Sequence, residues 1–449
     1  MPQDKQLCRQ ETTYGRGCSP KDDCPDLRLY KVQYSFTEKA IQVICYVRLM
    51  YDVNAIRKDF PILEHVIYLD NAATSQTPKP AVEAINEYFF AYAGNYGRGA
   101  HRLARQTTEH YENSRETVAD FFSCEPKNVI FTKNTTESIN MVAHGQEWSP
   151  GDHIITSTIE HHSNYLPWVA LRTDGVILDV VESNQEGIID PARIDAAITD
   201  RTKLIALSHV SNVFGSVQDI SRVIKIGRRN DIPVLIDAAQ SAGHLRLSSN
   251  DLRCDFLAVP GHKGLLGPQG TGILILQDPE GLRPTTLGGG AVEWVRGFEY
   301  ELLEPPARFE AGTPNIPGII GLGRSVEYVN TLGVSNVEKH IANLARVAAK
   351  KLSEIDNVTV YGPKDRAGVV PFNVGQLNPH DVSMILDETS SICTRSGYHC
   401  AMPALESLGI NGTVRASFGA YNTAKEVETL VDSVSMIATS LDEPLHSVA

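Results

Sequence analysis

Long apolar runs are missing from the 449-residue sequence. A helix that spans a bilayer needs about 18 or more consecutive apolar residues, and the best candidate, residues 41–47 (IQVICYV), is much shorter. The N-terminus has Asp4 early and no apolar stretch followed by a small-residue cleavage site, so it does not look like a secretory signal. We therefore expect a cytoplasmic protein without membrane-spanning segments.

Cysteine is also scarce. Eight cysteines in a chain of this length are too few for a disulfide scaffold, and a reducing compartment would keep them as thiols. Four of them, Cys8, Cys18, Cys24 and Cys45, lie in the first tenth of the chain. Their spacing lacks the C-x2-C pattern of a structural zinc site, so we predict no metal there.

Basic charge is not in excess. The chain has 41 Lys and Arg against 54 Asp and Glu, a net charge of −13 at pH 7, which is a poor match to a phosphate backbone. Nucleic acid is therefore not expected as a main partner. With 21% charged and 42% hydrophobic residues, the composition is that of an ordinary soluble protein, which argues against disorder along the whole chain.

The length predicts two or three domains. Residues 1–49 carry more basic than acidic side chains, in contrast to the rest of the chain, and we expect a poorly ordered extension, or a segment that precedes a true start at Met50. We predict a large domain over residues 65–320. A small domain would combine residues 50–64 and 321–449.

From Met50 onward, short apolar, β-branched runs alternate with amphipathic stretches, which predicts an α/β fold with a mostly parallel sheet covered by helices. The predicted strands are residues 129–132, 154–157, 176–181, 204–207, 234–236, 256–259 and 272–276. A Gly-rich stretch between the last two could deliver an antiparallel strand and is a position for a chemically active loop. The C-terminal part should be α+β and end in a helix capped by Thr423 and Glu426.

Two charged residues follow predicted strands in the middle of the chain. Asp237 ends the run VLID, at the sheet edge where ligands of open α/β sheets bind, although an isolated acid there could be a helix N-cap or a surface group. Lys263 lies in the loop GHKGLLGPQG after the next strand, and alone it could be a solvated lysine. Together they fit a Schiff-base lysine and a carboxylate that pairs with the ring nitrogen of pyridoxal phosphate (PLP).

Two polar motifs follow other strands. In NTTES, the backbone N–H groups at a helix start and the hydroxyls of Thr135 and Thr136 would form an anion site, unless this is a plain capping box. In IEHHSN, His161 could lie flat against a conjugated ring. Alternatively, His161 and His162 could be metal ligands or a polar pair, but no third ligand at helical spacing is nearby.

These motifs, taken together and in this order, resemble the fold-type I PLP enzymes, and specifically the class V aminotransferase group that contains the cysteine desulfurases. The similar stretches are YLDNAATSQTP (68–78), NTTES, IEHHSN, SHVSNVFG (208–215), DAAQ, GHKG, RFEAGTPN (308–315), TRSGYHCAMP (394–403) and TVRASFGAYNT (413–423). The resemblance extends from Tyr51 to the last helix. It implies a large PLP-binding domain and a smaller C-terminal α+β domain that carries the catalytic cysteine.

The resemblance also implies roles for individual residues. Lys263 would hold PLP, Asp237 would keep the pyridine nitrogen protonated, and His161 would stack on the ring. Arg415 would grip the substrate carboxylate, with Arg395 as a further substrate-binding residue. The other cofactor contacts would come from Asn212, Gln240, Thr135, Thr136 and His262, and from Thr313 reaching in from a second subunit, which implies a homodimer with shared active sites.

Cys400, in SGYHCAMP, would separate a desulfurase from an ordinary transaminase. It lies beside His399 and near Arg395, surroundings that favour a thiolate, and the family's nucleophile occupies the matching position. The implied reaction converts L-cysteine to L-alanine and leaves a persulfide on Cys400. The resemblance further implies that the sulfur passes to an acceptor protein for iron–sulfur cluster assembly. The short segment around Cys400 resembles the group II (SufS-like) desulfurases. We interpret the other thiols of the main part of the chain, Cys124, Cys254 and Cys393, as buried structural groups.

Three residues depart from the family pattern. Pro260 stands where relatives commonly have Ser or Thr before Gly-His-Lys, which removes a hydroxyl and an N–H group from the expected phosphate site. Asn134 replaces a common Gly, and Tyr398 replaces a common His two residues before the nucleophile.

Three alternatives to a desulfurase remain open from the sequence. They are a lyase acting on selenocysteine or cysteine sulfinate, another aminotransferase or epimerase on this scaffold, and a sulfur-relay or scaffold protein that has lost efficient PLP binding. The lyase and the aminotransferase would be indifferent to the loss of Cys400.

Overall fold

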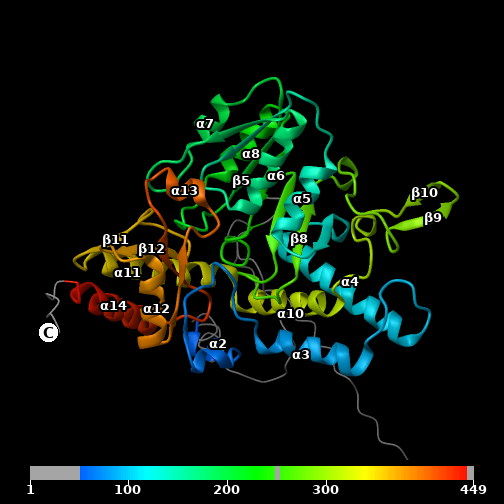
Figure 1. The fold of residues 1–449 in the computed structure, drawn as a ribbon. Helices are drawn as coiled ribbons and strands as arrows, with labels where there is room; N and C mark the ends of the chain where they lie inside the picture. Colours follow the sequence, from blue (N-terminus) through cyan, green and yellow to red (C-terminus); the bar gives the residue numbers. More distant parts are fainter. Residues whose placement is uncertain (1–50, 248–252, 442–449) are drawn as a thin grey trace, which may run out of the picture. The chain divides into compact units, whose positions relative to one another are not determined.

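The computed structural model describes residues 51–247 and 253–441 (Figure 1). The predicted extension at residues 1–49, with the four cysteines for which no metal site was predicted, lies outside the described residues. In the described part of the chain, no helix combines the length and the hydropathy that crossing a membrane requires.

A seven-stranded sheet in the order β2-β8-β7-β6-β5-β3-β4 forms the centre of the fold. Its strands are β2 (Val129–Thr132), β3 (His153–Ser157), β4 (Ile177–Val181), β5 (Thr202–Ser208), β6 (Val234–Asp237), β7 (Phe256–Pro260) and β8 (Gly272–Leu276). All seven predicted strands are therefore present. The five from β7 to β4 are parallel, and β8 is antiparallel to β7, as predicted for the strand after the Gly-rich loop.

The direction of β8 decides where the loops of this sheet meet. Because β2 and β7 are both antiparallel to β8, β2 runs in the same direction as β7. The carboxyl ends of β2, β3, β5, β6 and β7 therefore lie at one edge of the sheet, where open α/β sheets bind their ligands.

Helices cover both faces of this sheet, because successive strand residues enter two different apolar clusters. Ile130 and Ile154 pack with α5 (Thr135–Gly145) and α6 (Leu166–Leu171). Their neighbours Phe131 and Ile155 pack on the other face with α4 (Arg102–Phe122), α7 (Pro191–Ala196), α8 (Ile220–Arg229) and α10 (Ile316–Leu332). Each fully buried side chain of this size contributes about 1.5–3 kcal/mol to stability. The fold is thus the predicted α/β type with a mostly parallel central sheet.

A second, antiparallel sheet has the order β11-β12-β15-β14. Its strands are β11 (Val358–Val360), β12 (Val369–Val374), β14 (Arg395–Gly397) and β15 (Thr413–Ser417). It packs against α11 (Val334–Ser353), α12 (Pro379–Ser390) and α14 (Ala424–Thr439), which lie together in Figure 1. The predicted capping box of Thr423 and Glu426 is present at the start of α14.

Smaller elements join distant parts of the sequence. Strand β1 (Ile67–Tyr68) pairs in parallel with β13 (Ile392–Cys393). In the segment before β1, which includes α2 (Val53–Arg57), Arg57 forms an ion pair with Glu426 at 2.8 Å. Helix α3 (Lys79–Glu87) packs against α10, and the hairpin of β9 (Val292–Arg296) and β10 (Glu299–Leu302) projects away from the sheets (Figure 1). The division into two domains stays a prediction, and α10 runs through its boundary at residues 320–321.

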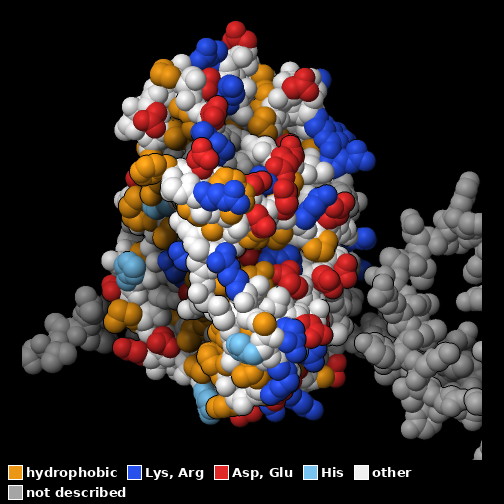
Figure 2. Space-filling model, turned by 90° about the vertical axis from the view of Figure 1, so that its right-hand side faces the viewer, with side chains coloured by type: hydrophobic (Ala, Val, Ile, Leu, Met, Phe, Trp, Pro, Cys, Tyr) orange, Lys and Arg blue, Asp and Glu red, His pale blue; other side chains and the backbone are white. Residues whose placement is uncertain are grey.

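The surface of the described chain mixes both signs of charge. On the face shown in Figure 2, acidic and basic side chains are interspersed rather than gathered into separate regions. This distribution agrees with the sequence, in which neither acidic nor basic residues form long blocks.

Two glycines, one in the loop after β6 and one in the loop after β7, lie where an added side chain would have no room. A Cβ atom at Gly264 would lie 2.2 Å from the carbonyl oxygen of Ala242, and one at Gly243 would lie 2.1 Å from the carbonyl oxygen of Gly264. Because both neighbours are backbone atoms, neither can move aside without shifting its loop. This close approach fixes the position of Lys263, which directly precedes Gly264.

We expect Gly264→Ala to lower the free energy of unfolding by about 2 kcal/mol or more, because overpacking of this kind forces a backbone shift. The matched control is Gly289→Ala, where an added Cβ would meet no atom within 4 Å and the change should stay within about 0.5 kcal/mol. Urea unfolding of the two variants measures the difference. Equal stabilities would contradict the packing described for this loop.

Candidate active site

A cavity of about 190 Å³ lies at the carboxyl edge of the large sheet. Four strands deliver its polar side chains: His161 follows β3, Asn212 follows β5, Asp237 ends β6 and Lys263 follows β7. Eight of the nine predicted cofactor-contacting residues line it: Thr135, Thr136, His161, Asn212, Asp237, Gln240, His262 and Lys263. Residues spread over more than a hundred positions are therefore brought together by the parallel strands.

The cavity holds one amine and one buried carboxylate. Burial lowers the pKa of Lys263 to about 8, although the carboxylate of Asp237 acts in the opposite direction. Asp237 is 3% exposed, and its Oδ1 accepts a hydrogen bond from the N–H of Ala239 at 2.8 Å. Burial raises the pKa of Asp237, against the effect of that hydrogen bond and of Lys263. An amine that is easily deprotonated is a nucleophile for a carbonyl carbon.

The start of α5 offers hydrogen-bond donors to the same cavity. The cap is Asn134, whose Oδ1 accepts from the N–H of Glu137 at 2.9 Å. The carboxylate of Glu137 accepts from the N–H of Lys133 rather than from that of Asn134, so the alternative of a capping box is met in one of its two bonds. The first N–H groups of a helix have no partner within it. The hydroxyl of Thr135 is buried without a hydrogen-bond partner among the described residues, whereas Thr136 bonds to Ser163 at 2.7 Å. These donors suit an anion.

Two neutral histidines border the cavity. The Nδ1 atom of His161 accepts from the N–H of Ser163 at 3.1 Å, and burial lowers the pKa of His161 to about 3. The Nδ1 atom of His262 lies 3.1 Å from the hydroxyl of Thr74, and burial lowers the pKa of His262 to about 4. Both rings are uncharged near neutral pH, so they can contact an aromatic ligand and donate one N–H each. Within residues 51–247 and 253–441, no three His, Cys, Asp or Glu side chains are arranged to hold a metal.

A buried acid supports this histidine loop, and the sequence reasoning missed it. Glu160 is fully buried and accepts hydrogen bonds from Ser157 at 2.5 Å, Asn164 at 2.6 Å and Ser208 at 2.5 Å. Burial raises the pKa of Glu160 to about 7, against these hydrogen bonds. Its position directly before His161 in IEHHSN was the available signal.

Cys400 lies in a turn after β14, near a cation. The Nη2 atom of Arg395 is 3.9 Å from the Cys400 sulfur. The Nε2 atom of His399 is instead bonded to Thr413 at 2.8 Å, and burial holds the pKa of His399 well below its usual value. The expectation that His399 helps to favour a thiolate is therefore wrong, because a neutral ring adds no positive charge. Arg395 supplies the positive charge at this position.

The second arginine is fixed opposite the first. Arg395 and Arg415 are paired in the register of β14 and β15, so their side chains share one face of the sheet. Arg415 donates to Asp70 at 3.0 Å and to the carbonyl oxygen of Asn212 at 2.9 Å. Its Nε atom is buried and has no hydrogen-bond partner among the described residues. Asp70 belongs to the similar stretch YLDNAATSQTP, and the sequence predicted no role for it or contact with Arg415.

Asn212 joins the cavity to the cysteine turn. Its side chain lines the cavity, and its Nδ2 atom donates to the carbonyl oxygen of His399 at 2.7 Å. Its Oδ1 atom is buried without a partner among the described residues. Asn212 thus contacts the turn directly while it keeps an acceptor available.

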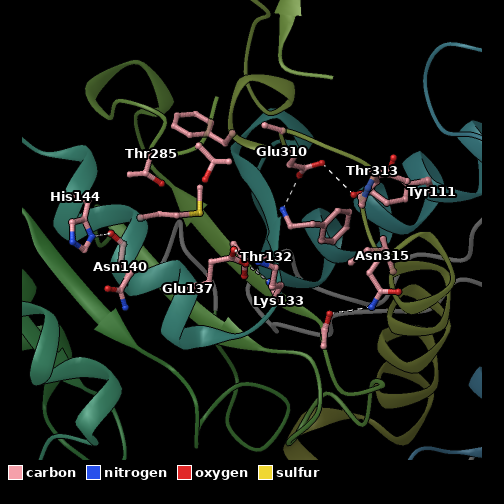
Figure 3. A pocket seen from close by; sticks show the side chains of 18 residues that line it. Tyr111, Thr132, Lys133, Glu137, Asn140, His144, Thr285, Glu310, Thr313 and Asn315 are labelled. Atoms are coloured by element: carbon pink, nitrogen blue, oxygen red, sulfur yellow. Dashed lines mark hydrogen bonds and ion pairs between the residues drawn. The ribbon is translucent and has the colours of Figure 1, made fainter. Parts of the chain in front are cut away.

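Thr313 is not brought to this cavity within the chain. It lines a different cavity of about 480 Å³, on the loop that also carries Glu310 and Asn315 (Figure 3). Glu310 anchors this loop through two hydrogen bonds to the buried Arg115, at 2.7 and 2.9 Å. The prediction that Thr313 reaches a cofactor from a second subunit stays a prediction.

The remaining predictions concern three cysteines and two residues that depart from the family pattern. Cys254 is buried, as expected, and burial raises its pKa to about 12. Cys124 and Cys393 are only partly buried, so their description as buried thiols is wrong. Pro260 lines the cavity, and Tyr398 packs against an apolar cluster around Phe214 and Leu405.

Comparisons with known proteins show what this chain is similar to. A family model described as aminotransferase class-V matches residues 67–430. A probable cysteine desulfurase of Methanothermobacter thermautotrophicus is 44% identical over 389 residues, which cover 85% of this chain and 97% of the relative. The matched region begins at β1, ends within α14 and contains every residue that lines the cavity.

Solved structures of cysteine desulfurases are also similar to this chain. The apo structure of a cysteine desulfurase from Thermococcus onnurineus is 44% identical and aligns with a TM-score of 0.84, covering 86% of this chain and 98% of that one. A cysteine desulfurase from Escherichia coli is 33% identical and aligns with a TM-score of 0.81, covering 87% of this chain and 99% of that one.

The lowered pKa of Lys263 generates a test by amine labelling. In the protein without cofactor, acetylation of Lys263 should rise with pH around a midpoint near 8, because only the neutral amine reacts. Asp237→Asn should move this midpoint lower, since it removes the carboxylate that raises the pKa. Peptide mass spectrometry follows Lys263, with the exposed Lys203 as internal reference. A midpoint near the ordinary lysine value of about 10.4 would contradict the burial described here.

Proposed function

This chain belongs to the class V aminotransferase family, and we propose that it is a PLP-dependent cysteine desulfurase with Cys400 as its nucleophile. The observation that carries the proposal is the convergence of two groups on one region: the Lys263–Asp237 pair in the cavity, and Cys400 beside Arg395. Asn212 lines the cavity and bonds to the turn of Cys400. An ordinary transaminase has no use for the second group.

The cavity residues fit PLP. A phosphate matches the unpaired donors at the start of α5, including the buried Thr135 hydroxyl. Lys263 offers the amine for the aldehyde, Asp237 offers a buried carboxylate for the ring N–H, and His161 offers a neutral ring surface. When bound, PLP supplies an electron sink for a carbanion at the substrate Cα. Pro260 contributes neither a hydroxyl nor an N–H to the phosphate site, so the other donors carry this contact.

Arg415 is suited to hold the substrate carboxylate. It is 2% exposed and is oriented by Asp70 and by the carbonyl oxygen of Asn212. Its unpaired Nε atom leaves a donor for an incoming carboxylate, and an arginine fork can bind such a group through two hydrogen bonds. Arg395 lies nearer to the Cys400 sulfur and stabilises negative charge there.

The reaction then needs a proton acceptor and a sulfur nucleophile. With a pKa of about 8, the amine of Lys263 can accept the proton from the substrate Cα near neutral pH. The Cys400 thiolate attacks the sulfur of L-cysteine, forming an S–S bond as the substrate C–S bond breaks. After the carbon is protonated, alanine leaves and the enzyme keeps a persulfide. The sum is L-cysteine plus enzyme thiol giving L-alanine plus enzyme persulfide.

The persulfide requires an acceptor. We propose that a separate sulfur-acceptor protein takes the terminal sulfur, in keeping with the short segment around Cys400, and that the sulfur serves iron–sulfur cluster assembly. Cys400 is partly exposed, so an external thiol can reach it.

Replacement of Cys400 by Ala should stop alanine formation from L-cysteine, with a loss of about 100-fold or more, because no other group in the site can take the sulfur. The cofactor absorbance should not change. A single-turnover assay, with alkylation of the persulfide and peptide mass spectrometry, measures both products. Cys393→Ala is the matched control and should keep its activity, since Cys393 lies on β13 and outside the cavity.

The same assay separates the rival reactions. Undiminished alanine formation from L-cysteine by Cys400→Ala would exclude the nucleophile proposed here. Activity of that variant confined to selenocysteine or cysteine sulfinate would identify a lyase, because those substrates release their β-substituent without a thiolate. A requirement for a second amino acceptor would identify an aminotransferase.

We also propose a homodimer in which Thr313 completes the cofactor site of the opposite subunit. Thr313→Ala should weaken PLP retention although Thr313 does not line the cavity of its own chain. Mixing and refolding Thr313→Ala with Lys263→Ala should restore activity, since a mixed dimer has one complete site. Light scattering checks the mass of each species. A monomer, or mixed variants without recovery, would contradict the shared site.

A further inference from the structure

The turn that carries Cys400 has an unfavourable backbone conformation. His399 and Cys400 have φ angles of 53° and 56°, in the left-handed region, which is unfavourable for residues other than glycine. Within the turn, the N–H of Ala401 donates to the carbonyl oxygen of Tyr398 at 3.0 Å. A strained turn of this kind persists only where its surroundings hold it, so contacts from other elements decide where Cys400 lies.

His162, in the loop after β3, contacts this turn in two ways. Its backbone N–H donates to the carbonyl oxygen of Cys400 at 2.7 Å. Its ring atom Nε2 accepts from the backbone N–H of Met402 at 3.3 Å. The two bonded groups flank Ala401, so one residue fixes the chain directly behind the nucleophile.

The second of these bonds also caps a helix. Met402 is the first residue of α13 (Met402–Glu406), and the N-cap residue Ala401 makes no side-chain cap bond. The first N–H groups of a helix lack partners within it, and a side chain that accepts from one of them stabilises the helix start. The His162 ring supplies from a distant segment the acceptor that Ala401 lacks.

We propose that His162 is a positioning residue for the nucleophile, which holds the Cys400 turn in place through the bond from Met402 N–H to its Nε2 atom. This inference rests on the proposed function, because it takes Cys400 as the nucleophile. Asn212 fixes the other side of the turn through the carbonyl oxygen of His399. His161 has a different task, since its Nδ1 atom is bonded within its own loop and it lines the cavity.

Two substitutions of His162 distinguish its role as a hydrogen-bond acceptor from the other contributions of its ring. His162→Leu removes the acceptor and keeps an apolar side chain of moderate size. His162→Gln keeps an acceptor, because its amide oxygen takes a place similar to that of Nε2. His65→Leu, at an exposed histidine before β1, is the control for the loss of any histidine. The backbone bond from His162 to Cys400 is retained in every variant.

Hydrogen exchange in the PLP-loaded protein reports directly on the bond. Exchange of the Met402 amide should be about fivefold faster in His162→Leu, the change expected when one hydrogen bond is lost. It should match the wild type in His162→Gln and His65→Leu. A single-turnover assay with L-cysteine at saturating concentration should show that persulfide forms on Cys400 about fivefold to tenfold more slowly in His162→Leu. The L-cysteine concentration that gives half of the maximal rate should not change. In His162→Gln the rate should return to the wild-type value.

The outcomes are distinct. Wild-type exchange and persulfide rates in His162→Leu would overturn the proposal, and so would equal losses in the Leu and Gln variants, because then the acceptor is not what matters. If the wild-type protein forms no persulfide on Cys400, the proposed function fails. In that case the exchange rate of the Met402 amide alone decides whether His162 holds the turn.

Discussion

The gathering of three cationic side chains, two of them buried, in one region is the constraint on which the rest of the site depends. Burial lowers the pKa of Lys263 and the pKa of Arg415. Neighbouring positive charge lowers both further, because Arg415 and Arg395 act on Lys263 and Arg395 acts on Arg415. Asp237 and Asp70 offset part of the unfavourable charge. The remaining imbalance favours anionic groups, and the proposed reaction brings three of them: a phosphate, a carboxylate and a thiolate. Charge that is costly in the protein alone thus becomes the basis of ligand binding.

The sequence predicted the large sheet well because buried parallel strands are continuous apolar runs, which are visible without any tertiary information. The site residues at strand ends could be found for the same reason, since the carboxyl ends of parallel strands meet. Local geometry was predicted less well, for a physical reason. A helix cap depends on the rotation of one side chain, so the sequence did not show which residue of NTTES caps α5. The direction of the His399 ring depends on a left-handed turn that no periodic pattern reveals.

Long-range contacts explain what the sequence could not show. The bond from Met402 to His162 joins residues 240 positions apart, and the bond from Asn212 to His399 joins residues 187 apart. Such pairs leave no periodic signal in one sequence. Asn212 combines several of them, because it contacts the cavity, the cysteine turn and Arg415. Its single side chain and carbonyl group therefore couple cofactor site, nucleophile and substrate arginine.

The contact between Asp70 and Arg415 has a consequence for synthesis. The two residues are 345 positions apart, so at about 5–20 residues per second the ribosome needs roughly 20 to 70 seconds between them. Strands β2 to β8 can pair during this interval, because their partners have already been made. Arg415 is added only afterwards, and its carboxylate partner, which follows β1, has been part of the chain throughout this interval. The reactive centre is therefore closed by residues that are synthesised after every strand of the large sheet.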